Sequence, residues 1–365
     1  MMLNLKKEFS LIKKVLREKS LYPDKKRKSK YKRFYEIIKL RVFEGYAFAK
    51  NYNKYGFDIE NFNNYKDYID GTFLHTNGYN KKKGLRRYNH VTANKFLLYC
   101  YLSNINPKIT PKVYNVLKNG KSTTFMNQNK TVEDIVQNMK NGEKLCFKLE
   151  CGHAGIGFFL LEKRDDKVII NNGKYDLETF YSLVKKKTYL VQEFVYQHKD
   201  IDKFNPSTLN TIRLVTFLAK GKYRYLGAMF RCGTSNKECI DNASNGGIFV
   251  GINDDGTLKD TGYFLKAKSS KIHPTSKIKF EGYQLPMYKE VIDLALKYHA
   301  YFPGLKSLGW DIAITENGPI IIEINVGWQT SSIQMCHGGF RKKIEEIYGQ
   351  KYKEIVKQEK KNLKS

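Results

Sequence analysis

The pattern of apolar and polar positions divides the chain into a helical beginning and a remainder rich in β-strands. Near the start, apolar residues recur every three or four positions with lysines between them, which predicts two basic amphipathic helices. The two stripes are Leu5, Phe9, Ile12 and Leu16, and then Phe34, Ile37, Ile38 and Val42.

Further along, short apolar runs alternate with turn-forming residues, which predicts antiparallel hairpins. The expected strands cover residues 144–150, 158–163, 167–170, 189–195, 211–219, 223–232, 247–253, 310–315 and 319–325. Helices are expected at residues 91–101, 177–187 and 286–301. Hairpins with helices interspersed among them indicate an α+β fold.

A chain of 365 residues is long for one compact unit, so we expect more than one domain or subdomain. Residues 1–90 are expected to form a basic, mainly helical N-terminal region. Residues 91–345 are expected to form the main domain, divided near residue 196 into two subdomains, and residues 346–365 a basic helical tail.

Positive charge is the dominant feature of the composition, with 65 Lys and Arg against 36 Asp and Glu. Such an excess attracts polyanions, including nucleotides, nucleic acid and anionic lipid. Residues 1–50 hold 16 basic against 5 acidic residues, and residues 341–365 hold 9 against 4. Because the charge gathers at the ends and no recognised nucleic-acid motif combines it with aromatic residues, we expect no specific nucleic-acid partner.

The basic helices at the start allow two interpretations. Their apolar stripes can pack on the main body while the lysines face solvent, which is the simpler reading. Alternatively, they can attach the protein to an anionic membrane surface. No stretch resembles a secretory signal or a membrane span, so we expect a cytoplasmic protein, with peripheral attachment to the inner face of the membrane as the alternative.

The cysteines favour a reducing compartment, because the six of them show no C-x-x-C spacing. A zinc ion held by Cys146, Cys151 and His153 is conceivable. Ordinary apolar cysteines are the simpler interpretation.

The most informative segment is the hairpin at residues 309–329. Asp311 opens one strand, and Glu323 and Asn325 close the other. Residues two apart on a strand face the same side, so Glu323 and Asn325 project together and the hairpin returns them toward Asp311. Two carboxylates and an amide oxygen suit Mg²⁺ shared with phosphates. Taken alone, the segment is equally consistent with a polar surface hairpin.

A glycine-rich turn lies upstream of this hairpin. Gly152, Gly155 and Gly157 connect two predicted strands, an arrangement in which backbone N–H groups can fold over phosphates. Lys148 would add positive charge beside them. A tight structural turn is the alternative, and no helix follows as it does in a Walker A or a Rossmann loop.

The order of these parts along the chain resembles the ATP-grasp superfamily. Lys95 at a helix start is followed by Lys148 with its glycine loop, by the strand at 189–195, and by the hairpin at 309–329. Within that superfamily, residues 205–216, 241–249 and 309–315 are similar to the sugar-transfer-associated ATP-grasp family, whose bacterial members are associated with capsule and surface-polysaccharide synthesis. The resemblance covers nearly the whole chain.

The resemblance implies an ATP-grasp fold, in which two α+β subdomains clamp ATP, and two Mg²⁺ ions as further cofactors. It assigns Lys95 and Lys148 to the ATP phosphates and the three glycines to the mobile phosphate loop. The hinge strand that holds adenine corresponds to Gln192, Glu193 and Val195. Asp311, Glu323 and Asn325 correspond to the metal ligands. For the ribose-binding acid, Asp200 and Asp202 are both candidates.

The implied activity is that of an ATP-dependent carboxylate–amine ligase with an acyl-phosphate intermediate. Its expected substrates are a small-molecule or glycan carboxylate and an amine, with an amino acid joined to a sugar or sugar acid. Arg213 and Arg231, on two strands of one hairpin, would donate to the oxyanion that forms, unless they are ordinary surface arginines. A phosphotransferase acting on a glycan-related hydroxyl is the alternative enzyme.

Overall fold

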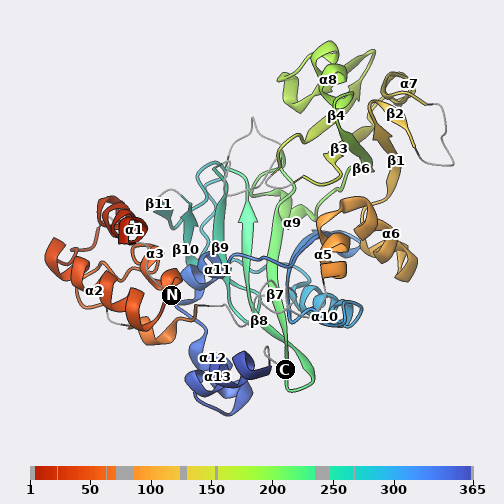
Figure 1. Cartoon of the computed structure of the whole chain (residues 1–365). Coiled ribbons are helices and arrows are strands. Elements are labelled where there is room, and N and C mark those ends of the chain that lie inside the picture. Colours follow the sequence, from red (N-terminus) through yellow and green to blue (C-terminus); the bar gives the residue numbers. More distant parts are fainter. Residues whose placement is uncertain are drawn as a thin grey trace.

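The structure is a computed structural model that describes residues 5–22, 24–62, 64–70, 86–123, 130–152, 155–234, 246–265 and 268–362. These residues form two antiparallel sheets with helices packed around them (Figure 1). The expectation of an α+β fold is therefore confirmed. Residues 241–245 of one family-like segment, Cys239 and His153 lie outside the described residues.

The smaller sheet has six strands in the spatial order β2-β1-β6-β3-β4-β5. In chain order the strands are β1 (Val113–Lys118), β2 (Lys121–Ser122), β3 (Lys144–Leu149), β4 (Phe159–Arg164), β5 (Lys167–Ile170) and β6 (Thr188–Glu193). Helices α7 (Val132–Gln137) and α8 (Leu177–Val184) pack on it through a core of their own. In that core, Phe180 meets Phe147 and Phe159 edge to face, each at 5.1 Å between ring centroids.

The larger sheet has seven strands in the order β11-β10-β9-β8-β7-β12-β13. They are β7 (Thr211–Ala219), β8 (Lys222–Cys232), β9 (Ile248–Ile252), β10 (Leu258–Phe264), β11 (Lys268–Ser270), β12 (Ser307–Thr315) and β13 (Gly318–Asn325). Because side chains alternate along a strand, Ile212 and Leu214 face one side and Val215 and Phe217 the other. Both faces are buried, which explains why these strands read as nearly continuous apolar runs.

Different helices cover the two faces of the larger sheet. One face packs on α6 (Lys95–Ile105) and α10 (Tyr288–His299) in the largest core cluster. The other face is covered by segments from both ends of the chain (Figure 1). These segments are α1 (Leu5–Arg17), α2 (Lys30–Phe43), α3 (Tyr46–Lys50), α11 (Thr330–His337), α12 (Arg341–Tyr348) and α13 (Tyr352–Asn362).

The first predicted amphipathic stripe packs only in part. Ile12 is buried with Leu11 and Val15 against the larger sheet, whereas Phe9 on the same helix is 64% exposed. The packing interpretation therefore holds for the inner side of α1. In the second stripe, on α2, Ile37 is buried, whereas Phe34, Ile38 and Val42 are exposed.

The helix expected at residues 91–101 is in fact two helices, α5 (Arg86–Ala93) and α6, which meet at Asn94. The Asn94 side chain accepts hydrogen bonds from the amides of Phe96 and Leu97, so it caps α6 and ends α5. Lys95 consequently occupies the first turn of α6. The remaining short helical segments are η1 (Asn64–Asp67), η2 (Pro107–Ile109), η4 (Asn171–Gly173) and α9 (Lys199–Asp202).

None of the helices in the described part of the chain is both long enough and apolar enough to cross a membrane.

Candidate active site

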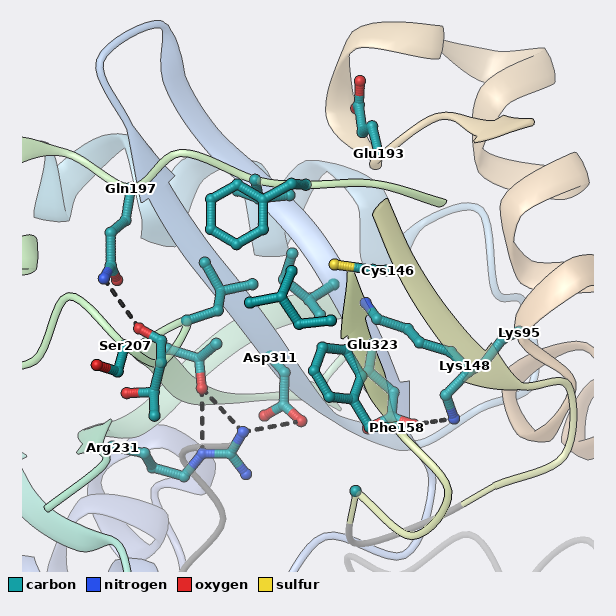
Figure 2. A pocket seen from close by; sticks show the side chains of 18 of the residues that line it. Lys95, Cys146, Lys148, Phe158, Glu193, Gln197, Ser207, Arg231, Asp311 and Glu323 are labelled. Carbon is teal, nitrogen blue, oxygen red and sulfur yellow. Dashed lines mark hydrogen bonds and ion pairs between the residues drawn. The ribbon is translucent and has the colours of Figure 1, made fainter. Parts of the chain in front are cut away.

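The two sheets share a cavity of about 530 Å³ that brings together residues far apart in the sequence. The smaller sheet contributes β3, β4 and the end of β6, and the larger sheet contributes β7, β8, β12 and β13. Figure 2 shows Lys95 and Lys148 on one side of the Asp311 and Glu323 carboxylates and Arg231 on the other. Most of the residues predicted to carry the chemistry line this cavity, namely Lys95, Lys148, Gly152, Gly155, Glu193, Val195, Arg213, Arg231, Asp311, Glu323 and Asn325.

The register of the larger sheet places charged residues in one row across three strands. Arg213 on β7 lies opposite Asp311 on β12, which lies opposite Glu323 on β13. A bulge follows at Ile312, so the pairing shifts immediately beyond this row. Two positions further along β13, Asn325 pairs with Gly309, where a β-carbon would lie 2.5 Å from the Trp328 β-carbon. A residue larger than glycine at position 309 would therefore push against Trp328 and disturb the pairing with Asn325.

Asp311 is almost completely buried, and two arginines surround it. The Arg213 guanidinium donates to both of its carboxylate oxygens, at 2.5 and 2.9 Å, and Arg231 lies 3.3 Å away. Burial alone would raise the pKa of Asp311, but the two guanidinium groups outweigh burial and hold this pKa below its ordinary value. Arg231 is also held by Thr211, whose hydroxyl accepts from Nη2 at 2.8 Å. Both arginines are thus fixed in place by partners rather than being solvated on a surface.

Lys95 connects the glycine loop to the row of charges. Its ammonium group donates to the Gly152 carbonyl at 2.6 Å and to the Glu323 carboxylate at 2.9 Å. The Lys95 amide also donates to the Glu150 carbonyl at 2.9 Å. Since Glu150 and Gly152 begin the turn after β3, one lysine fixes the start of that turn against β13.

The glycine turn needs its glycines for steric and conformational reasons. Gly152 and Gly155 line the cavity, whereas Gly157 lies behind it. Gly157 has φ +69°, and a β-carbon there would lie 2.9 Å from Leu149 Cδ1 and 3.0 Å from the Tyr189 hydroxyl. Both the backbone conformation and the nearby Leu149 and Tyr189 side chains disfavour other residues at this position. Gly152 and Gly155 are therefore the glycines of this turn that line the cavity, and Gly157 has a packing role.

The predicted hinge strand separates into residues that face the cavity and one that does not. Glu193 and Val195 line it, together with the intervening Phe194. Gln192 is buried on the sheet, where its side-chain amide donates to the Pro111 carbonyl at 3.0 Å. The Glu193 carboxylate accepts from the amide of Lys112, the residue before β1, at 2.7 Å, so this side chain is already engaged. Contacts from this strand to a ligand would therefore come mainly from the backbone.

The sequence-based prediction missed the walls of a largely apolar slot beside the hinge. Cys146, Phe158, Leu160 and Ile322 supply its side chains. The alternation of β3 was the available signal, because positions 144, 146 and 148 share one face of the strand. Lys144 belongs to that face and lies 5.1 Å from the Phe194 ring centroid.

The two candidates for the ribose-binding acid have different environments. Asp202 lines the cavity, and its carboxylate accepts from Gln197 at 2.9 Å. Asp200 instead pairs with Lys203 at 2.6 Å on the exposed side of α9. Gln197 also donates to the Thr208 carbonyl at 2.9 Å (Figure 2). Asp202 is therefore the better placed of the two acids.

The chemistry of the donors at the row of charges fits Mg²⁺. Asp311, Glu323 and Asn325 carry oxygen donors of the kind that Mg²⁺ prefers. In the structure the Asp311 carboxylate accepts from Arg213 and from the Asn325 amide nitrogen, the latter at 3.3 Å, and the Glu323 carboxylate accepts from Lys95. Among the described residues, no three His, Cys, Asp or Glu side chains form a metal-binding cluster, so a metal here would need the amide and substrate oxygens as well. The same finding gives no support to zinc at Cys146 and Cys151 within that part of the chain.

Comparison with known protein families decides the assignment. The model of the family described as sugar-transfer associated ATP-grasp matches residues 75–348, about three quarters of the chain. The chain belongs to this ATP-grasp family. The resemblance seen in the order of its motifs is thereby confirmed, and the clamp of two α+β subdomains is the fold that the family name denotes. No curated protein matches the sequence.

Several solved structures are similar to the chain at low identity. D-alanyl-alanine synthetase A from Vibrio cholerae is 13% identical, with a TM-score of 0.43, over 75% of this chain and 66% of that one. The D-alanine–D-alanine ligase from Bacillus anthracis is 11% identical, with a TM-score of 0.39, over 75% and 69%. The L-amino acid ligase from Bacillus licheniformis is 10% identical, with a TM-score of 0.38, over 68% and 43%. The chain spans about half to two thirds of the length of most of these proteins.

Proposed function

We propose that the protein is an ATP-dependent carboxylate–amine ligase that acts through an acyl phosphate. Its substrates would be an amino acid and a sugar or sugar acid of a bacterial surface polysaccharide. Membership of the sugar-transfer-associated ATP-grasp family supports the nucleotide and the polysaccharide setting. The single observation that carries the proposed chemistry is that Lys95, Lys148, Arg213 and Arg231 share one cavity with Asp311, Glu323 and Asn325.

The shape of the cavity supports ATP as the nucleotide. The apolar slot of Cys146, Phe158, Leu160 and Ile322 suits a flat base, with the backbone of residues 193–195 along its edge. Lys148 and the turn at Gly152 lie further in, where the phosphates of a base held in this slot would extend. Asp202 lies at the side of the cavity, where it would accept hydrogen bonds from a ribose.

The charges in the cavity explain why a divalent cation is expected. Its lining holds five basic and four acidic side chains, so it is close to neutral. ATP brings about four negative charges, and a carboxylate acceptor adds another. Asp311, Glu323 and Asn325 would hold Mg²⁺, which when bound would neutralise part of the phosphate charge. Lys95 and Lys148 would orient the phosphates toward the acceptor.

The two arginines are suited to the second half of the reaction. When an amine attacks the acyl phosphate, negative charge develops on the former carbonyl oxygen, and positioned donors stabilise it. Arg213 and Arg231 reach the cavity from adjacent strands and are both anchored on Asp311. This anchoring would hold their remaining N–H groups in place before the substrate arrives.

Product analysis tests the proposal. Amino acids would be combined with uronic acids and amino sugars in the presence of ATP and Mg²⁺, and ADP, phosphate and coupled products would be measured. A ligase gives ADP, free phosphate and an amide. Hydroxylamine in place of the amine should trap the activated carboxyl group as a hydroxamate, because it attacks acyl phosphates.

A phosphorylated acceptor formed without free phosphate would instead identify a phosphotransferase. Glu323→Gln provides the control that any activity belongs to this cavity, since it removes a carboxylate while keeping the side-chain shape. Hydroxamate that forms at the same rate with this variant would not depend on Glu323, and the assignment of the reaction to this cavity would then be wrong.

A further inference from the structure

Helix α2 presents a second apolar stripe that faces away from the body of the protein. Five residues spaced three or four apart form this outer stripe, which comprises Tyr31, Phe34, Tyr35, Ile38 and Val42. All five are exposed, with Tyr31 at 89%, Tyr35 at 67% and Val42 at 65%. The spacing places them along one face of the helix.

The inner face of the same helix already provides its packing. Ile37 and Leu40 are buried in the cluster that joins α1, α2 and α3 to the larger sheet. The outer stripe is therefore not needed to hold α2 on the protein. At the end of the helix, Phe43 continues the exposed apolar surface at 76% exposure.

This surface is unusual within the molecule. Of the fifteen exposed large apolar side chains on described residues, eight lie between Phe9 and Tyr46. Single exposed apolar residues need no explanation, whereas a contiguous group of them marks a binding surface. A hollow of about 330 Å³ lies beside the stripe and is lined by Tyr35 of the stripe and by Phe43 at the end of the helix.

The charges around the stripe indicate the partner. Acidic residues pair with the inward basic ones, as in Arg27 with Asp58 and Arg41 with Glu8. The exposed basic residues of this region lie on α1, between α1 and α2, on α2 itself and at the end of α3. Lys32 and Lys39 are the ones that flank the stripe and also line the hollow. Residues 1–50 together carry 16 basic and 5 acidic residues.

We propose that the outer stripe of α2 docks on an anionic membrane surface. Exposed Tyr and Phe side chains suit the interface between headgroups and acyl chains, and flanking lysines attract anionic lipid. Figure 1 shows α2 at the outer edge of the molecule, on the side opposite β3 and β4. Docking through α2 would thus hold the enzyme at the membrane by a surface remote from the smaller sheet.

Vesicle flotation with the full chain tests this proposal. Wild-type protein would be mixed with vesicles of phosphatidylcholine alone or with about a third phosphatidylglycerol. We expect at least about tenfold tighter binding to the anionic vesicles, falling as salt is added. Lys32→Gln with Lys39→Gln should weaken anionic binding roughly fivefold per lysine.

The stripe is tested by Tyr31→Ser, Tyr35→Ser and Val42→Ser combined. This variant should lose about tenfold or more in binding to anionic vesicles while its melting temperature and ATP affinity stay at wild-type values. A matched control removes apolar surface elsewhere, with Ile272→Ser and Tyr301→Ser, which are 43% and 40% exposed. The control should bind vesicles as the wild type does.

Three results would overturn the proposal. The first is equal binding of the wild type to neutral and anionic vesicles, or no binding to either. The second is wild-type binding of the stripe variant to anionic vesicles, since the lysines alone would then account for the attraction of the protein to the membrane. The third is a dimeric wild type that the stripe variant converts to a monomer without any change in vesicle binding, because a second copy of the chain would then cover the stripe.

Discussion

Lys95 and Glu323 are 228 residues apart in the chain, yet they form an ion pair at 2.9 Å. Lys95 begins helix α6, which packs on the larger sheet, and Glu323 lies near the end of β13 in that sheet. The same ammonium group holds the Gly152 carbonyl at 2.6 Å. A nucleotide bound between the sheets would meet the glycine turn, the lysine and the carboxylate as one connected unit.

Lys148→Ala is expected to weaken binding of ATP with Mg²⁺ by about tenfold or more, because it removes a positive charge from the cavity. Calorimetric titration measures the affinity. Lys167→Ala is the matched control, since it removes an exposed lysine from the same subdomain and should leave the affinity unchanged. Equal affinities in wild type and Lys148→Ala would place the nucleotide elsewhere.

Asp311→Asn is expected to lower the free energy of unfolding by about 2–4 kcal/mol, because the buried guanidinium of Arg213 would lose its charged partner. Chemical denaturation without ligands measures this loss. For comparison, Asp260→Asn affects a carboxylate that is 54% exposed and 4.0 Å from Lys271, and it should cost less than about 0.5 kcal/mol. Similar values for the two variants would mean that the buried pairing of Asp311 with Arg213 contributes little to stability.

His299 is expected to make the protein less stable as the pH falls from about 6.5 to 4. Burial lowers its pKa to about 4, despite the hydrogen bond to the Leu305 carbonyl. Its other ring nitrogen lies 2.8 Å from the Thr216 hydroxyl. In this pH range the unfolded chain binds a proton at His299 and the native protein does not, so about 3 kcal/mol of stability is lost across it.

Denaturation at several pH values tests the role of His299. His299→Gln should reduce the slope of stability against pH by about one proton between pH 6.5 and 4. A wild-type slope in His299→Gln would mean that this histidine is not held neutral.

The strands of the site were predictable because their signals are local. Alternation and the turn around Asn317 and Gly318 suffice to predict the hairpin, whereas the pairing of Asp311 with Glu323 depends on the bulge between Asp311 and Ile312, without which Asp311 would lie opposite Ile322. The position of Arg213 beside Asp311 was not predictable, since it depends on β7 lying next to β12, and nearly a hundred residues separate them. Likewise, the break at Asn94 depends on a side-chain cap that competes with an apolar pattern running through it.

The direction in which a stripe faces is also a property of the folded protein. On α2, Ile37 is buried and Ile38 is exposed, although the two are neighbours with the same side chain. Gln192 and Glu193 differ likewise: Glu193 lines the cavity and Gln192 is buried away from it, because neighbouring strand residues face opposite sides. Sequence periodicity identified these segments, but it did not say which side meets the sheet.

Glu323 is proposed to belong to a metal and nucleotide site. Replacing Glu323 with Gln is the sharpest test of that proposal. Glu323→Gln removes the negative charge and keeps the shape, whereas Asn325→Asp keeps an oxygen ligand and adds a charge. Turnover of ATP with a productive substrate pair, or formation of hydroxamate, would be measured across a Mg²⁺ titration. Melting temperatures would show that both variants are folded.

We expect the Glu323→Gln variant to turn over ATP at least about a hundredfold more slowly than the wild type at every Mg²⁺ concentration. Asn325→Asp should retain more activity. If folded Glu323→Gln turns over at the wild-type rate, the carboxylate has no part in the reaction, and both the metal site and the ligase proposed around it are contradicted.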